Sequence, residues 1–155
     1  MKKGIFIISA LYLSVLFFSS CHKAYTDLTN TNGNSQVSSS SLAGNWVMSS
    51  FVQGTEDKSS AFKDYVFSFN ATSTNSGGLV ASKNGKSIDG TWNYSPAVTY
   101  YGSTSKSSMV INLGSSSPFD RLSATWNVDS TTSSTELHLS SPEISEDEHL
   151  VFVKN

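Results

Sequence analysis

Apolar side chains recur at every second position through most of the chain after residue 42. The run from residue 65 to residue 70 shows the pattern, because Tyr65, Phe67 and Phe69 alternate there with smaller or polar side chains. Successive side chains of a β-strand point to opposite faces, so a period of two is typical of strands with one buried face. We therefore predict short strands rather than helices in this part of the chain.

Six further runs alternate in the same way. Their predicted inward residues are Leu42, Gly44, Trp46 and Met48; Ile88, Gly90, Trp92 and Tyr94; Met109, Ile111 and Leu113; Leu122, Ala124, Trp126 and Val128; Leu137 and Leu139; and Leu150 and Phe152. Residues 77–83 supply a weaker strand, and residues 98–101 offer one more. The pattern thus predicts eight or nine strands.

Turn sequences separate these runs. The strongest is Asn84-Gly85, which suits a two-residue type I′ hairpin turn joining the strand of Val80 to that of Ile88. Many short antiparallel strands with one apolar face either stack as a sandwich or close into a barrel. A barrel leaves no exposed edge strand, so we expect an all-β fold, an antiparallel up-and-down barrel of eight or nine strands.

The first 21 residues have a different character. Lys2 and Lys3 precede an apolar run from residue 5 to residue 18, which small residues and then Cys21 follow. This order is typical of an export signal peptide, and the run is short for a membrane span, which needs about 20 apolar residues. Cys21 is the only cysteine of the chain, so it has no disulfide partner within it.

The stretch FSSC, which ends at Cys21, resembles a bacterial lipobox. The resemblance implies cleavage before Cys21, attachment of acyl chains such as palmitate to that residue, and anchoring in a membrane. His22 follows the cysteine, which by the same resemblance favours the outer membrane, on its periplasmic or cell-surface face. The alternative is an ordinary signal peptide with an incidental cysteine.

Residues 22–41 are rich in Ser, Asn and Thr and nearly without aliphatic side chains. Such a segment buries too little apolar surface to offset its ordering entropy, so we expect a flexible tether. The predicted organisation is a signal peptide over residues 1–20, a lipidated tether over residues 21–41 and a barrel domain over residues 42–155.

Charge and motifs restrict the chemistry. The whole chain has net charge −2, and without Lys2 and Lys3 it has 8 basic against 12 acidic residues, which argues against binding to nucleic acid. The acidic group before His149 does not have the ligand spacing of a calcium loop, and we interpret it as a solvated loop. Two S-x-x-K stretches, at Ser60 and Ser103, are expected by chance in a serine-rich chain. We therefore predict no catalytic residue, no metal site and no cofactor.

The sequence Gly44-Asn45-Trp46 at the start of the first strand resembles the G-x-W motif of lipocalins. Together with the later strand pattern, it makes residues 42–154 similar to small lipocalin-like lipoproteins of Gram-negative bacteria. The resemblance implies a structural role for Gly44 and Trp46, with Trp46 plugging one end of the barrel. In lipocalins an arginine after the last strand packs over this tryptophan, whereas here Lys154 occupies the end of the last strand.

Two functions follow from this architecture. In the first, the barrel binds a small apolar or amphipathic ligand without catalysis, since an eight-stranded barrel can hold one small ligand. The pocket residues would then be Phe67, Phe69, Trp92, Met109, Ile111, Trp126 and Leu139. In the second, large inward aromatic side chains fill the barrel, which then acts as an interaction module for an envelope protein or a glycan. An exposed aromatic patch near Tyr100 or Tyr101 would favour this second function.

Overall fold

The computed structural model describes residues 39–155. The predicted signal peptide, Cys21 and most of the predicted tether lie outside the described residues. The elements in chain order are α1 (Ser39–Leu42), β1 (Gly44–Gln53), β2 (Glu56–Asp57), η1 (Ser59–Phe62), β3 (Val66–Ala71), β4 (Ser76–Lys83), β5 (Lys86–Ser95), β6 (Thr99–Tyr100), β7 (Ser103–Thr104), β8 (Ser108–Asn112), η2 (Phe119–Arg121), β9 (Thr125–Val128), β10 (Glu136–Ser140) and β11 (Glu148–Lys154). None of the helices between residues 39 and 155 has the length and apolar character needed to span a membrane.

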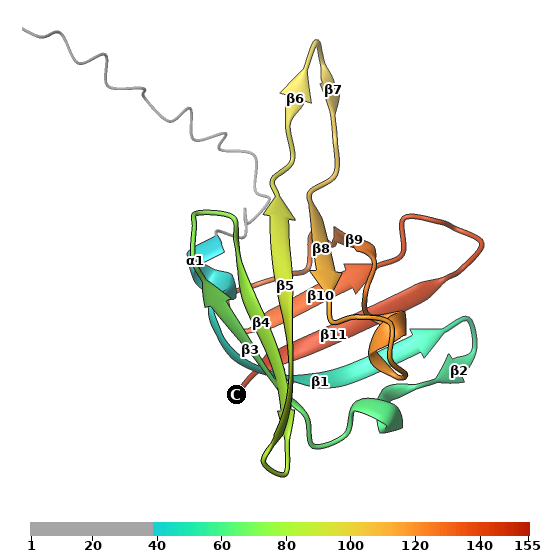
Figure 1. The fold of residues 1–155 in the computed structure, drawn as a ribbon. Helices are drawn as coiled ribbons and strands as arrows, with labels where there is room; N and C mark the ends of the chain where they lie inside the picture. The colour runs from blue at the N-terminus through green and yellow to red at the C-terminus, as the bar shows by residue number, and fades with distance from the viewer. Residues whose placement is uncertain (1–38) are drawn as a thin grey trace, which may run out of the picture. The chain divides into compact units, whose positions relative to one another are not determined.

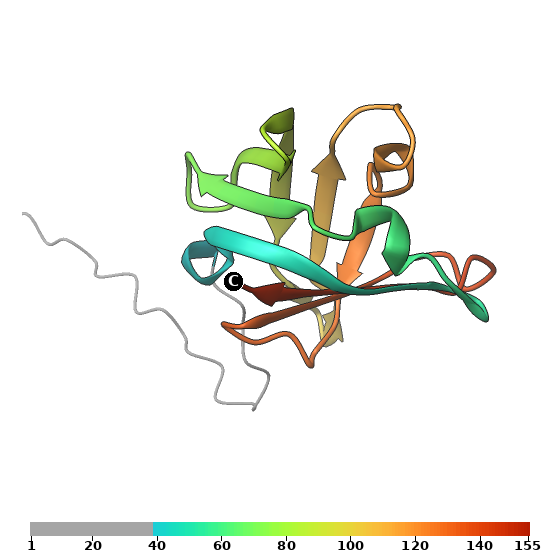
Figure 2. The same ribbon diagram turned by 90° about the horizontal axis from the view of Figure 1, so that it is seen from below.

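Eight strands form a closed antiparallel barrel. Each strand pairs with the next in the order β1, β3, β4, β5, β8, β9, β10 and β11, and β11 pairs back with β1 (Figure 1). Figure 2 shows β1 and β11 running side by side at this closure. The short β2 pairs only with β1, and β6 and β7 form a separate two-stranded sheet. The all-β, up-and-down, eight-stranded barrel predicted from the sequence is thus confirmed, with one additional strand on its sheet.

The predicted hairpin turn at Asn84-Gly85 is also confirmed. Both residues have positive φ, 53° for Asn84 and 74° for Gly85, as a type I′ turn requires. The turn joins β4 to β5 and brings Lys83 opposite Lys86.

Most of the predicted inward residues lie in the core of the barrel. The side chains no more than 1% exposed include all three tryptophans and all six phenylalanines of residues 39–155. The full set is Leu42, Trp46, Phe51, Phe62, Phe67, Phe69, Leu79, Ala81, Trp92, Met109, Ile111, Phe119, Leu122, Trp126, Leu137, Leu139, Leu150 and Phe152. On the opposite face of their strands, Asn93, Asn112 and Thr125 are exposed, and Ser68 and His138 are half-buried. The period of two therefore identified the two faces of most strands correctly.

Strand β1 changes face midway. Its pairing with β11 shifts between Met48 and Ser50, which marks a β-bulge. A bulge places two residues opposite one and reverses the alternation beyond it. As a result Trp46 and Phe51 are both fully buried although an odd number of positions separates them. Simple alternation does not predict the inward position of Phe51.

The run from Leu122 to Val128 is not one continuous strand. Strand β9 begins only at Thr125, and Ala124, predicted to point inward, is exposed. The reason is the hydroxyl of Ser123, which donates to Phe119 O and Gly114 O at 2.9 and 2.8 Å and accepts from Leu113 N at 2.9 Å. These bonds hold the end of η2 in a turn, and the strand alternation starts after it.

One end of the barrel is closed around Trp46. Its indole Nε1 donates to Leu42 O at 2.8 Å, and Lys154 Nζ lies 5.2 Å from the centre of its ring. Lys154 Nζ also donates to Ser41 O at 3.0 Å. Gly44 has φ of 129°, and a Cβ there would lie 2.9 Å from Lys154 Cε, so a side chain would disturb both the backbone and the lysine stem. The G-x-W residues thus have structural contacts, and Lys154 takes the position over the tryptophan ring.

Candidate functional site

The residues predicted to line a ligand pocket all lie inside the barrel. Phe67, Phe69, Trp92, Met109, Ile111, Trp126 and Leu139 are each no more than 1% exposed. The barrel brings several of them together: the rings of Phe69 and Trp92 are 6.0 Å apart, Trp92 pairs across strands with Ile111, and Met109 pairs with Trp126.

Aromatic rings fill the interior beside these residues. Phe152 lies 5.1 Å from Phe67 and 6.2 Å from Phe69, ring centre to ring centre. Phe62 and Phe119, from η1 and η2, pack against each other at 6.0 Å. A space large enough for a water molecule next to a side chain would leave part of its surface accessible, so side chains that are 0–1% exposed have atoms packed on all sides.

The β6–β7 hairpin carries the exposed aromatic side chains. Tyr100 is 71% and Tyr101 is 91% exposed, whereas the other aromatic side chains of residues 39–155 are buried or half-buried. The two tyrosine rings lie 4.3 Å apart at 75° to each other. Figure 1 shows the hairpin projecting beyond the end of β5, away from the barrel. The predicted extra strand over residues 98–101 corresponds to β6, in this hairpin and outside the barrel.

Local hydrogen bonds define the hairpin. Val98 N donates to Ser105 Oγ and Ser105 N donates to Val98 O, both at 2.9 Å. Tyr101 and Gly102 have φ of 47° and 80°, so they form the turn with both residues in the left-handed region. This conformation suits glycine and is unusual for a bulky side chain, so Tyr101 occupies a strained position at the tip.

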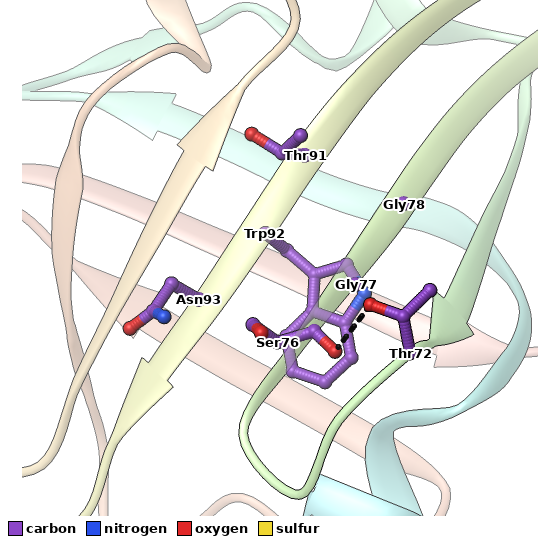
Figure 3. A pocket seen from close by; sticks show the side chains of 7 residues that line it. All are labelled: Thr72, Ser76, Gly77, Gly78, Thr91, Trp92 and Asn93. Atoms are coloured by element: carbon purple, nitrogen blue, oxygen red, sulfur yellow. Dashed lines mark hydrogen bonds between the residues drawn. The ribbon is translucent and has the colours of Figure 1, made fainter.

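A second surface feature is an open hollow of about 400 Å³ on strands β4 and β5 (Figure 3). It is lined by Thr72, Ser76, Gly77, Gly78, Thr91, Trp92 and Asn93. Of these seven residues, only Trp92 was predicted from the sequence to line a pocket. The adjacent glycines at 77 and 78 were an available signal, because glycine within a strand often marks a site where another group approaches the backbone closely.

Titratable side chains are scattered over the surface. His138 pairs with Glu136 at 3.1 Å and His149 with Asp147 at 3.3 Å. Burial raises the pKa of the Glu148 carboxyl, the nearby charge of Glu146 raises it further, and Arg121 lowers it. Within residues 39–155, no three His, Cys, Asp or Glu side chains are grouped so that they could hold a metal ion. Ser60 and Ser103, of the S-x-x-K stretches, are exposed in η1 and β7.

No protein-family model matches the chain, and neither a curated protein nor a solved structure is significantly similar to it. The eight-stranded antiparallel barrel is compatible with a lipocalin-like fold.

Proposed function

We propose that the chain is a lipid-anchored, non-enzymatic protein of the cell envelope whose packed barrel presents the β6–β7 hairpin to another envelope protein. The observation that carries this proposal is the exposure of Tyr100 and Tyr101 at the tip of a projecting hairpin. The lipid anchor at Cys21, in the outer membrane, rests on the lipobox-like sequence.

The composition of the hairpin favours a protein partner. Apart from Val98, the segment from Val98 to Ser105 consists of Thr, Tyr, Gly and Ser. Tyrosine offers a large, rigid and amphipathic contact at low entropic cost, and Ser and Gly adapt their hydrogen bonds to the partner, as in antibody loops. Tyrosine is also enriched among the residues that dominate protein–protein binding energy.

The strained backbone at Tyr101 supports the same proposal. A residue without a side chain would form this turn at lower cost, so a tyrosine there destabilises the isolated hairpin. Contact between the projecting Tyr101 ring and a partner would offset the energetic cost of this strain.

The packed interior supports the interaction module over a carrier of small apolar ligands. The seven residues of the predicted pocket are each no more than 1% exposed, and of them only Trp92 borders the open hollow on β4 and β5. A ligand inside the barrel would have to displace aromatic side chains that already bury their surface, at the cost of the packing they lose.

The test is site-specific photo-crosslinking in living cells of the source organism. A photoreactive phenylalanine replaces Tyr101 in one variant and Ile144 in a control, because Ile144 is 96% exposed in a different loop. We expect one discrete protein adduct from position 101 and none of that mass from position 144, and we expect Tyr100→Ser to reduce the yield.

Two results would contradict the proposal. Identical adducts from both positions would mean that the hairpin has no particular partner. An absence of adducts together with binding of the purified protein to isolated envelope polysaccharide, lost on Tyr100→Ser, would identify a glycan as the partner instead of a protein.

A further inference from the structure

Each strand of the β6–β7 hairpin has a free edge. Within residues 39–155, β6 pairs only with β7 and neither strand joins the sheet of the barrel. The residues of both strands are exposed, and Figure 1 shows the hairpin projecting beyond the barrel, so the barrel does not cover these edges. A free strand edge presents backbone N–H and C=O groups with which another extended chain can pair.

The hydrogen bonds of the hairpin show which backbone groups lie on its free edges. Ser105 N donates to Val98 O at 2.9 Å, so these two residues form a hydrogen-bonded pair. Hydrogen-bonded and non-hydrogen-bonded pairs alternate along antiparallel strands. Thr99 and Thr104 are the next pair, so their backbone groups point away from each other and out of the hairpin. The free edge of β6 therefore presents the N–H and C=O of Thr99, and that of β7 presents those of Thr104.

The two faces of the hairpin differ in polarity. Val98, directly before β6, and Tyr100 are two positions apart and share one face, where they are 60% and 71% exposed. The ring of Tyr101 lies 4.3 Å from the ring of Tyr100. The other face carries Thr99 and Thr104, whose hydroxyl oxygens are 2.9 Å apart. The exposed apolar surface of the hairpin is thus concentrated on one face.

The apolar side chains also lie on the β6 side of that face. Opposite Val98 and Tyr100 on the second strand are Ser105 and Ser103. Side chains on the same face of neighbouring strands contact each other. A strand added beside β6 would therefore bury surface of Val98 and Tyr100, whereas one added beside β7 would contact serines. The β6 edge is the more favourable place for an added strand.

The β6 edge lacks the charged side chains with which proteins commonly protect free edges. No charged residue occurs between Pro96 and Ser105, and Lys106 follows only after β7. Pro96 lies before the hairpin and leaves the N–H of Thr99 in place. Because β6 has only two residues, backbone pairing at this edge is short. Stable binding then also requires the side-chain contacts with Val98 and Tyr100, which makes the edge selective.

We infer that the partner contributes an extended strand that pairs with the free edge of β6. One C=O and one N–H of this strand bond to the N–H and C=O of Thr99, and its apolar side chains cover Val98 and Tyr100. In strand addition of this kind, main-chain hydrogen bonds supply affinity and alternate side chains supply specificity. The inference rests on the function proposed for the hairpin and specifies the form of the partner's contacting segment.

The test adds two proline variants to the photo-crosslinking experiment in living cells, with the photoreactive phenylalanine at position 101 throughout. Thr99→Pro removes the N–H on the β6 edge, and Thr104→Pro removes the N–H on the β7 edge. Proline is tolerated in a strand where the N–H faces solvent. Both variants also remove one partner of the same hydroxyl contact, so they perturb the hairpin alike and differ in the edge that they block.

We expect Thr99→Pro to lower the yield of the protein adduct about fivefold or more, which corresponds to the loss of roughly one hydrogen bond. Thr104→Pro should leave the yield within about twofold of the parent. Val98→Ser should also lower the yield, because it removes apolar surface beside the added strand. Val110→Ser is its matched control, since Val110 is 43% exposed on β8 of the barrel, and it should give the parent yield.

The possible failures are distinguishable. If the parent gives an adduct that neither proline variant changes, the tyrosine rings alone bind the partner, and the inference is wrong while the proposed function stands. If both proline variants lose the adduct equally, the partner recognises the shape of the hairpin and not the β6 edge, which also overturns the inference. If the parent gives no protein adduct, or adducts with lipid alone, the function proposed for the hairpin fails and the inference fails with it.

Discussion

Lys154 connects three segments at the closed end of the barrel. Its ammonium lies over the ring of Trp46 and donates to Ser41 O, and its stem passes close to Gly44. A cation over an aromatic face and a hydrogen bond from a charged donor each stabilise a partly buried site. The same group thus holds the last strand, the first strand and the segment before it together.

Replacing Lys154 tests this role at the scale of one residue. Lys154→Met keeps an unbranched stem and removes the charge, and it should lower the free energy of unfolding by about 1–2 kcal/mol. Lys154→Arg should retain most of the stability, since arginine also binds aromatic faces. Urea unfolding measures both, with Lys86→Met as a control at an exposed position at the start of β5. A control variant as unstable as Lys154→Met would contradict the prediction.

Glu148 should make stability depend on pH in the opposite sense to a carboxylate in an ion pair. Burial raises its pKa above the ordinary 4.5, so the folded protein binds the proton more tightly than the unfolded chain. Its contribution to stability is therefore greatest below the unfolded pKa and is lost as pH rises through the folded pKa.

We expect Glu148→Gln to be more stable relative to the parent at pH 7 than at about pH 4, where the parent carboxyl is largely protonated. Melting temperatures at the two pH values measure this difference. Glu143→Gln, at an exposed position in the loop that precedes β11, should show a smaller change with pH. An equal change in both variants would mean that general surface charge, and not the position of Glu148, is responsible.

At the scale of the element, each barrel strand has a buried and a solvated face. Trp126 is 1% exposed and its neighbour Thr125 is exposed, on the same strand β9. Trp126→Ala removes a large core side chain and should cost about 3–5 kcal/mol of unfolding free energy. Thr125→Ala should stay within about 0.5 kcal/mol of the parent. Denaturant titration compares the two, and similar losses would mean that both faces of the sheet are covered.

Alternation predicted these faces wherever a strand is regular. The inward positions of Phe67, Trp92 and Ile111 were predicted correctly, because successive side chains of a regular strand point to opposite faces of the sheet. Phe51 was missed because a bulge reverses the alternation, and the sequence around Met48 has no distinct mark of it. The inward position predicted for Ala124 was wrong because the Ser123 hydroxyl bonds to Leu113 and Gly114, just after β8, and holds the chain in a turn.

The surface features depend on contacts that a one-dimensional pattern does not contain. The tyrosines at 100 and 101 were noted in the sequence, but their projection follows from a hairpin that leaves the barrel between β5 and β8. The lack of a hydrogen-bond partner for the buried Trp92 indole among the described residues is visible only after every acceptor around it has been placed. The position of Lys154 over Trp46 likewise joins residues at opposite ends of the domain.

At the scale of the whole molecule, the few residues just before the first barrel strand are bonded to the barrel. The predicted tether ends at residue 41, whereas α1 extends from Ser39 to Leu42, with Leu42 O bonded to Trp46 and Ser41 O bonded to Lys154. Removing residues 22–38 should leave the melting temperature nearly unchanged, because their composition offers little apolar surface to bury.

Extending that deletion through Leu42 should lower the melting temperature clearly, since it removes a buried leucine and two backbone acceptors. Calorimetric scans of the two truncated proteins provide the comparison. A large drop for the shorter deletion would show that the predicted tether packs on the barrel.

The pairing of β1 with β11 has a consequence for the order of events in folding. The first strand needs the last one as a neighbour, and Trp46 lies opposite Lys154, the penultimate residue. Contacts between distant parts of a chain require long loops to close and slow the folding reaction. The barrel therefore closes only when β11 is available to pair with β1. The closure that leaves the eight barrel strands without a free edge thus makes β1 wait for β11 before it is paired on both sides.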